Sequence, residues 1–499
     1  MPGAGQRDAP LSPVEAIDHL LAYLPRPSRL LVAVSGGSDS IGLLVALKQA
    51  IDHSPPDTFE IVSVTIDHGL RPESAAEARS VGELCDRLDI PHVVRGWDGV
   101  KPATGVAAAA RTARYDLLCQ VAAERQACVI VTGHTFDDQI ETIAMRGART
   151  GGAGGAGSTG MASSTILNRR FPLLRPFLAT RRESIRDLLR DEAISWVEDP
   201  SNIDRRSERA RLRQDLPTVH AGDEAEVLRQ WREAAERRRQ LGAAAADLAG
   251  DYLSLHRRVA ARLDLDVLTG DQGALRLLIG ALTAVIGGRV HVPSRAVQAR
   301  ICQFLDNASP GRMTAGRVLF ERRREALYMV REDRDLPILR VEIGETVLWD
   351  GRFRISNHSD QALDVRPTLM TSVQGGQSGE GGPDAAHQQP ITGGLPPRIA
   401  RLARRSLPMV TECQGETAVG HATWPLPEAI AAGLTIERVL LPFDRFLPEF
   451  DWQLANSLAA VAELPSFPPS PFDVFSRKTG SAPAVALARG RRNPMLSDK

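Results

Sequence analysis

The feature that most constrains the fold is an alternation of apolar runs and helical patterns through the first 150 residues. β-branched, apolar runs are followed in turn by stretches with helical spacing or high alanine content, in pairs at 30–34 and 41–50, 61–66 and 75–88, 91–96 and 107–124, and 128–132 and 137–146. Short apolar runs bounded by turn residues are typical of strands buried on both faces of a parallel sheet. The alternation therefore predicts a doubly wound α/β domain, in which ligands bind beyond the carboxyl ends of the strands.

Composition changes along the chain predict further regions. After the α/β domain we expect a mostly helical domain and a small α+β C-terminal region, and within the α/β domain a Gly-rich loop at 151–160. The expected boundaries are an N-terminal extension with a helix at 1–28, the α/β domain at 29–217, the helical domain at 218–335, a β-rich segment at 336–372, a Gly/Gln/Pro-rich linker at 373–397, a C-terminal segment at 398–465 and a disordered tail at 466–499.

Charge and cysteine usage exclude several classes of protein. The 61 basic residues balance 61 acidic ones, so the chain lacks the overall positive charge of a protein that coats DNA. Its five cysteines include no C-x-x-C pair, which argues against a disulfide scaffold, a zinc ribbon or an iron–sulfur site and fits a reducing cytoplasm. We see neither a signal peptide nor an apolar run of the roughly 20 residues that a membrane helix needs.

The strongest local motif is Ser35-Gly36-Gly37-Ser38-Asp39-Ser40, which lies between an expected strand and an expected helix. Glycines allow the backbone to approach an anion, and the amides of a helix N-terminus then point at phosphate oxygens. Asp39 beside a polyphosphate requires a bridging cation, for which Mg²⁺ is the natural choice. The alternative is an ordinary Gly-Ser turn that caps a helix.

This motif resembles the phosphate loop of the N-type ATP pyrophosphatases, or PP-loop superfamily, which split ATP between the α and β phosphates. Further segments resemble motifs of one member family, the tRNA(Ile)-lysidine synthases, and follow in that family's order at residues 65–71, 109–115, 132–142, 160–161, 175–176 and 196–202. Two positions depart from the family pattern: Thr135 stands where a second histidine is usual, and Ala210 stands where an asparagine is usual.

The resemblance implies an ATP-dependent ligase that attaches L-lysine to the wobble cytidine of tRNA(Ile) with a CAU anticodon. The C2 oxygen of the cytidine attacks the α-phosphate of ATP, pyrophosphate leaves, and the lysine amine displaces AMP to give lysidine. The modification changes codon reading from AUG to AUA. The resemblance also implies ATP and Mg²⁺ as cofactors, a cytoplasmic location, no membrane partner and a homodimer.

The same reasoning assigns roles to individual residues. We expect catalysis by Asp39, Asp137 and Asp138, with Mg²⁺ held by Asp39 and Asp137. Nucleotide contacts are expected from the loop residues Ser35, Gly36, Gly37, Ser38, Asp39 and Ser40, together with Asp67 and His68. Substrate or tRNA contacts are expected from Arg111, Arg114, His134, Glu141, Arg205, Arg209, Arg211 and Arg213. For the acidic residues the alternative is a helix N-terminus that favours negative charge, and for the arginines it is a solvated helix face.

Two other functions stay open. A different PP-loop enzyme could modify tRNA by 2-thiolation, a chemistry that usually recruits sulfur through paired cysteines, and this chain has no such pair. The second is a catalytically silent RNA-binding protein gated by nucleotide, and the presence of Asp39, Asp137 and Asp138 argues against this hypothesis.

Overall fold

The computed structural model describes residues 9–70, 74–99, 101–150, 159–198, 223–307, 309–368, 394–414, 417–423, 433–469 and 472. The chain divides into two compact units, one formed by residues 1–236 with 468–499 and the other by residues 237–467. The division falls inside a long helix, α8 (Glu224–Tyr252). The narrower domain boundaries expected from the sequence stay predictions. No helix in the described ranges is long and apolar enough to cross a membrane.

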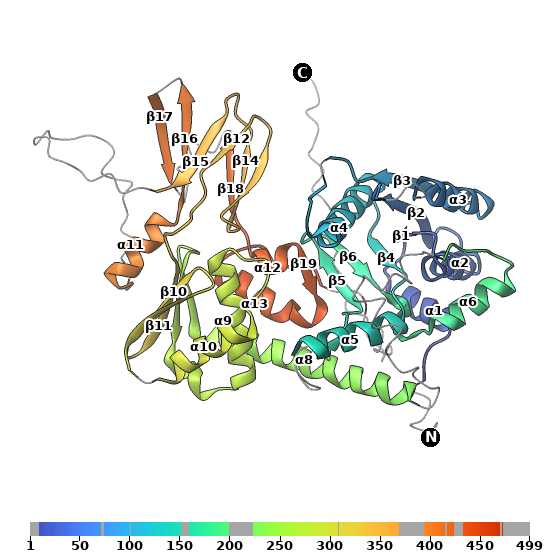
Figure 1. The fold of residues 1–499 in the computed structure, drawn as a ribbon, viewed down its shortest axis with the longest axis horizontal. Coiled ribbons are helices and arrows are strands. Elements are labelled where there is room, and N and C mark those ends of the chain that lie inside the picture. Colours follow the sequence, from blue (N-terminus) through green and yellow to red (C-terminus); the bar gives the residue numbers. More distant parts are fainter. Residues whose placement is uncertain are drawn as a thin grey trace, which may run out of the picture. The chain divides into compact units, whose positions relative to one another are not determined.

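The first unit contains the doubly wound, mainly parallel sheet that the sequence predicts (Figure 1). Strands β6, β4, β1, β2 and β3 are parallel neighbours in that order, and β5 pairs antiparallel with β6. Their bounds are β1 Ser28–Ala33, β2 Phe59–Asp67, β3 His92–Gly96, β4 Val129–Thr132, β5 Ser164–Leu167 and β6 Phe171–Leu174. β1 and β4 lie side by side at the centre, and both lead directly into the segments expected to carry chemistry.

The helices of this unit cover both faces of the sheet. α4 packs on β2 and β4, whereas α1, α2, α3 and α6 share one core cluster on the opposite face. Their bounds are α1 Pro13–Tyr23, α2 Ser38–Asp52, α3 Ser74–Arg87, α4 Val106–Glu124, α5 Phe136–Thr150, the 3₁₀ turn η3 Pro176–Ala179 and α6 Arg182–Asp191. α1 begins at a reciprocal cap in which Ser12 and Glu15 bond each other's backbone N–H groups.

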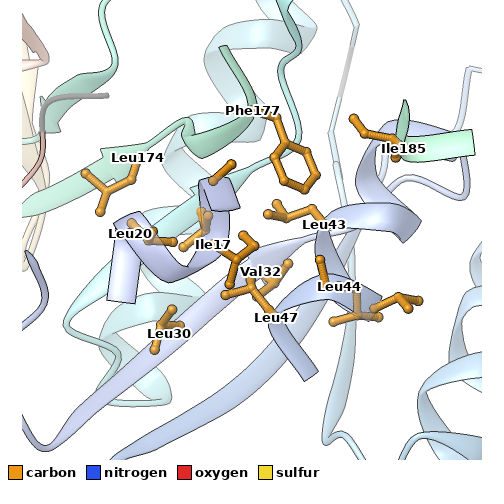
Figure 2. Packing of buried hydrophobic residues seen from close by; sticks show 14 of the residues in the cluster. Ile17, Leu20, Leu30, Val32, Leu43, Leu44, Leu47, Leu174, Phe177 and Ile185 are labelled. Carbon is orange, nitrogen blue, oxygen red and sulfur yellow. The ribbon is translucent and has the colours of Figure 1, made fainter. Parts of the chain in front are cut away.

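The core of this unit forms because one side of each strand faces one apolar side of each helix. Leu43, Leu44 and Leu47 of α2 pack with Ile17 of α1 and Val32 of β1, and all five are buried (Figure 2). Burying an aliphatic side chain of this size contributes about 1.5–3 kcal/mol. This packing fixes the start of α2 relative to the end of β1, and therefore fixes the loop between them.

The second unit contains helices and three antiparallel sheets, with strand orders β7-β8-β11-β10-β9, β12-β15-β16-β17 and β13-β14-β18. The first sheet and its helices have bounds β7 Leu253–His256, β8 Ala260–Asp264, η5 Leu265–Thr269, α9 Gln272–Gly287, α10 Arg295–Asp306, β9 Gly311–Ala315, β10 Val318–Arg322 and β11 Ala326–Arg331. The rest are β12 Leu339–Val341, β13 Thr346–Trp349, β14 Phe353–Asn357, β15 Leu363–Pro367, α11 Pro397–Arg405, β16 Pro408–Gln414, β17 Thr417–Thr423, β18 Leu434–Arg438, α12 Leu441–Asp444, β19 Phe446–Pro448, η8 Glu449–Asp451 and α13 Trp452–Val461.

The region expected to be mostly helical, 218–335, thus contains five strands as well as α8, α9 and α10. Apolar periodicity did not predict these strands because each has only four to six residues and because some of their buried residues are charged, such as Glu321 within β10. Arg322 closes β10 and Arg331 closes β11, and both are buried. From sequence alone an arginine is predicted to lie on the surface, because arginines are seldom fully buried unless they are paired.

Arg331 has its partner in Asp350, whose carboxylate lies at the centre of a buried ion cluster. Arg331 donates to both oxygens of Asp350 at 3.0 and 3.1 Å, Arg352 donates at 2.6 Å, and Arg317 pairs with the same carboxylate. The side chains of Asp350, Arg331 and Arg352 are fully buried. Burial lowers the pKa of Arg352 to about 10, and Asp350 opposes this shift. One carboxylate therefore pairs with three guanidinium groups.

Candidate active site

The phosphate-loop motif forms a sharp turn between β1 and α2. Gly36 has φ +84°, a left-handed conformation that favours glycine. The Ser40 hydroxyl accepts a hydrogen bond from the Ser35 N–H at 3.0 Å and donates to the Gly37 carbonyl at 3.1 Å, which ties the loop to the first turn of the helix. No side chain caps α2 at Gly37, so the start of this helix can offer backbone N–H groups to an anion in the loop.

Two distant motifs pack against this loop. A Cβ atom on Gly133, just after β4, would lie 2.5 Å from the carbonyl oxygen of Asp39, so only glycine permits the backbones to come this close. On another side, the Val197 N–H donates to the Gly36 carbonyl at 3.0 Å. The structure therefore brings the 132–142 and 196–198 segments to the loop. The first of these follows a strand, so its position was expected from the strand ends, whereas no position was predicted for the second.

Thr135 caps α5 in partnership with Asp138. The Thr135 N–H and hydroxyl both donate to one oxygen of Asp138, at 2.8 and 3.1 Å, and the Asp138 N–H donates back to the Thr135 hydroxyl at 3.3 Å. Both residues are buried. This reciprocal cap gives Thr135, which departs from the family pattern, a defined structural role: it orients the Asp138 carboxylate, whose other oxygen accepts a hydrogen bond from Arg182.

Arg182, the first residue of α6, connects the two carboxylates. Its Nε donates to Asp39 at 2.9 and 3.2 Å, and its Nη2 donates to the second oxygen of Asp138 at 3.3 Å. Burial lowers the pKa of Arg182, but Asp39 and Asp138 outweigh this effect and raise the pKa above its usual value. Burial raises the pKa of Asp39, and Arg182 acts against that shift. The three side chains form one partly buried ionic unit.

Asp137 points away from that unit. One of its oxygens accepts the backbone N–H of Arg182 at 2.8 Å, and the other lies 3.2 Å from Arg181. Asp137 thus satisfies an N–H at the start of α6 from outside the helix. Among the described residues no group of three or more acidic, histidine or cysteine side chains is arranged to hold a metal. The oxygens of Asp39 and Asp138, already facing a cation, are the kind of donor that Mg²⁺ prefers.

Asp67 and His68 lie at the carboxyl end of β2, the strand next to β1. The Gly69 N–H donates to Asp67 at 2.8 Å, and this bond is the main reason that the pKa of Asp67 is lowered. Burial lowers the pKa of His68, whose ring packs edge-on against Trp97 at 6.0 Å. Its Nδ1 is buried and has no hydrogen-bond partner among the described residues. That nitrogen can serve a ligand.

Arginine side chains gather at the ends of β4 and β6. Arg111 and Arg114 of α4 stack on Tyr115 at 5.0 and 5.6 Å, and Arg175 follows β6. Burial lowers the pKa of His134 to about 3, Arg175 acts in the same direction, and Asp138 opposes both. His134 is therefore a neutral imidazole, with Nδ1 3.0 Å from the Thr132 hydroxyl. Glu141, one turn further along α5 from Asp137, is buried.

Comparison with known proteins places this arrangement in a family. The PP-loop domain model matches residues 13–219. The tRNA(Ile)-lysidine synthase of Rhizobium meliloti is 37% identical over 89% of this chain and 94% of its own length. Those of Mesorhizobium japonicum and Brucella canis are 37% and 36% identical over 91% and 88% of this chain, and over 96% and 95% of their own lengths.

The chain belongs to the tRNA(Ile)-lysidine synthase family. The match runs through both compact units, so the family assignment covers the antiparallel sheets as well as the PP-loop domain. Among solved structures, the U34-tRNA thiolase NcsA from Methanococcus maripaludis matches 45% of this chain and 78% of its own, at 15% identity and a TM-score of 0.37.

Two residues of the site were not among the expected ones. Arg175 belongs to the motif at 175–176, for which the sequence predicts no individual role, and Arg182 is not among the predicted site residues. The signal available for Arg182 was its place at the first turn of α6, where a cation is unfavourable next to the helix dipole unless it has acidic partners. The expected tRNA contacts Arg205, Arg209, Arg211 and Arg213, together with Ala210, lie outside the described residues.

The neutral His134 predicts a specific acid sensitivity. Because its pKa is lower in the folded chain than in the unfolded chain, the unfolded state binds more protons between about pH 6.5 and pH 3. Folding stability should therefore fall as the pH drops through this window, and His134→Gln should make that fall shallower. Thermal unfolding of both proteins from pH 7 to pH 4 measures the two slopes; parallel slopes would show that the pKa of His134 is the same in the folded and the unfolded chain.

Proposed function

We propose that this protein uses ATP to attach lysine to C2 of the wobble cytidine of tRNA(Ile) with a CAU anticodon, through an adenylated tRNA intermediate. Family membership over nearly the whole chain is the observation that carries the proposal. The geometry supports it, since an uncapped helix N-terminus, two facing carboxylates and a group of arginines meet at one edge of the sheet. Adenylate transfer needs these elements together.

The phosphate loop and its neighbours divide the nucleotide contacts among them. We assign the N–H groups at the start of α2 to phosphate oxygens. The hydroxyls of Ser35 and Ser38, which contact Ser40 and Asp39 in this structure, would turn to the phosphates when ATP binds. We assign the adenosine side to Asp67 and to Nδ1 of His68, which has no hydrogen-bond partner in the described part of the chain; both residues lie at the end of the neighbouring strand. We make this assignment because β1 and β2 are parallel neighbours whose carboxyl ends lie side by side, so one ATP molecule can contact the residues that follow both strands.

Mg²⁺ would be held by Asp39 together with Asp138. When bound, the cation supplies neutralisation of phosphate charge. Sequence reasoning paired Asp39 with Asp137, but both oxygens of Asp137 are directed at Arg181 and at the backbone of Arg182. Asp138 is the carboxylate that shares a cation with Asp39, and we therefore propose it as the second ligand.

The residues that we assign to the substrates include both acidic and basic side chains. The buried carboxylate of Glu141 suits the ammonium group of L-lysine, and Arg111, Arg114 and neutral His134 suit the nucleotide being modified. The segment 205–213 is proposed to contact the tRNA backbone. A homodimer and a cytoplasmic location stay predictions; light scattering on the purified protein measures the first.

Trapping the intermediate tests the proposal against both alternatives. In the absence of lysine, incubation with ATP labelled at the α-phosphate should transfer label to tRNA(Ile) with a CAU anticodon, and adding lysine should release it as AMP. A tRNA with uridine at the wobble position is the control and should stay unlabelled. Label on the control but not on the CAU tRNA would favour a thiolation enzyme, and no label on either would favour a silent RNA-binding protein.

A further inference from the structure

Arg182 occupies the space between the two carboxylates assigned to the metal. Its Nε lies 2.9 and 3.2 Å from the oxygens of Asp39, while its Nη2 lies 3.3 Å from Asp138 and 3.4 Å from the Thr135 hydroxyl. One planar cation thus faces both acidic groups and the residue that orients one of them. Only 18% of the Arg182 side chain is exposed, and Asp39 and Asp138 are exposed by 22% and 11%.

The two carboxylates need such a cation because the fold forces them together. The close approach of Gly133 to the backbone of Asp39 fixes the start of α2 against the end of β4, and the reciprocal cap fixes Asp138 at the start of α5. Like charges held close in a partly buried site repel strongly. Without a counter-cation, this repulsion would act against the packing that builds the phosphate loop.

Arg182 and a divalent cation cannot hold Asp39 in the same way at once. Both oxygens of Asp39 accept hydrogen bonds from Arg182, and one also accepts the Ser38 hydroxyl at 3.1 Å. Mg²⁺ requires carboxylate oxygens at about 2.0–2.1 Å in near-octahedral geometry, which leaves no room for a guanidinium on the same face.

We propose that Arg182 is the counter-cation of the Asp39–Asp138 pair in the metal-free protein, and that it competes with the divalent cation for Asp39. The inference rests on the proposed function for the need of a cation at this pair. Arg182 is in this sense a positioning residue: it keeps the carboxylates in place before the metal arrives and sets how tightly the metal binds.

The backbone of Arg182 is anchored separately from its side chain, which allows the exchange. Asp137 accepts the Arg182 N–H at 2.8 Å and also contacts Arg181 at 3.2 Å. The guanidinium can therefore leave Asp39 by rotation of side-chain bonds while α6 stays in place. In this scheme Asp137 does not bind the divalent cation; it holds the backbone at the start of α6 in place while the Arg182 side chain moves.

A binding experiment without nucleotide tests the competition. Free Mn²⁺, followed by its electron paramagnetic resonance signal, is titrated with wild type, Arg182→Met and Arg190→Met. Arg182→Met should bind Mn²⁺ about tenfold more tightly than wild type, because charge-assisted hydrogen bonds of this kind contribute at least that much. Arg190→Met removes the same charge from the exposed side of α6, where Arg190 pairs with Glu183 and Asp187, and should bind like wild type.

Two further variants make the result decisive. Arg182→Lys keeps the charge but loses the planar group that reaches both carboxylates, so its Mn²⁺ affinity should lie between those of wild type and Arg182→Met; it carries the test if Arg182→Met does not fold. Adding Asp39→Asn to Arg182→Met should remove the gain. Affinities within twofold of wild type for both Arg182 variants, weaker binding, no Mn²⁺ binding by any protein, or a gain that survives Asp39→Asn would each overturn the inference.

Lysine incorporation by the wild-type protein, measured on the same preparation, separates the two claims. Unchanged Mn²⁺ affinity in the Arg182 variants with intact lysine incorporation rejects the role of Arg182 and leaves the proposed function standing. Tighter Mn²⁺ binding by Arg182→Met, with no lysine incorporation by wild type, supports the competition and rejects the proposed function. A second readout is hydrogen exchange in a metal chelator, where peptides from α2 and α5 should be less protected in Arg182→Met than in Arg190→Met.

Discussion

Asp39→Asn should reduce adenylation of the tRNA by about 100-fold or more, the scale expected when a preorganised charged group is removed from a reaction centre. Asn keeps the size of Asp39 but removes the charge that faces Arg182 and, in our proposal, the metal. The affinity for tRNA should stay within about twofold, since it depends on arginine contacts to the RNA backbone rather than on this carboxylate.

The rate is measured as pyrophosphate release at saturating tRNA(Ile), and the affinity by filter binding in the absence of ATP. Asp187→Asn on α6 is the matched control, because its side chain is 63% exposed and pairs only with Arg190 among the described ion pairs. It should react like wild type. Equal turnover by Asp39→Asn would refute a role for this carboxylate in the chemistry, whereas a parallel loss of tRNA binding would point to a misfolded loop.

Asp350→Asn should destabilise the second unit by about 3–5 kcal/mol, the usual cost of removing one partner from a buried ion pair. The change leaves Arg317, Arg331 and Arg352 facing one another with no carboxylate between them. Asp350 has φ +51°, and Asn accepts that backbone conformation as readily as Asp. The loss therefore reports on charge and not on backbone strain.

Because the chain has two compact units, a single melting temperature is a poor measure of this loss. Hydrogen exchange, followed on peptides from β11 and β14, localises it. Glu342→Gln, on the surface of the same unit with a side chain 63% exposed, is the control and should change stability by no more than about 0.5 kcal/mol. Unchanged protection of β11 in Asp350→Asn would show that the three arginines find other partners.

The parallel sheet and its helices could be predicted because each element has a strong period of its own. Every strand expected between residues 30 and 132 is present, and its bounds differ by only one or two residues from the prediction. The antiparallel sheets of the second unit were harder to predict because their cores include charged residues. Arg331, Arg352 and Asp350 are buried only as a group, and no local pattern states that they will meet.

The same limit applies to the site. The positions of the strand ends predicted that Asp39, Asp67, His68 and the 132–142 segment would lie at one edge of the sheet, since parallel strands end together. They did not distinguish Asp137 from Asp138, which are adjacent in sequence but face different partners, because that choice depends on where Arg182 lies. Side-chain direction at the start of a helix is set by packing across the fold, and the sequence alone does not carry it.

The most direct test of the central claim is the mass of the wobble nucleoside after reaction. Purified protein is incubated with ATP, Mg²⁺, lysine and tRNA(Ile) with a CAU anticodon, and the digested tRNA is analysed by mass spectrometry. We predict that the wobble cytidine gains the mass of lysine less one water, and that omitting ATP or lysine prevents the gain. An unmodified wobble cytidine, with ATP consumed in the presence of another tRNA or another nucleophile, would contradict the account.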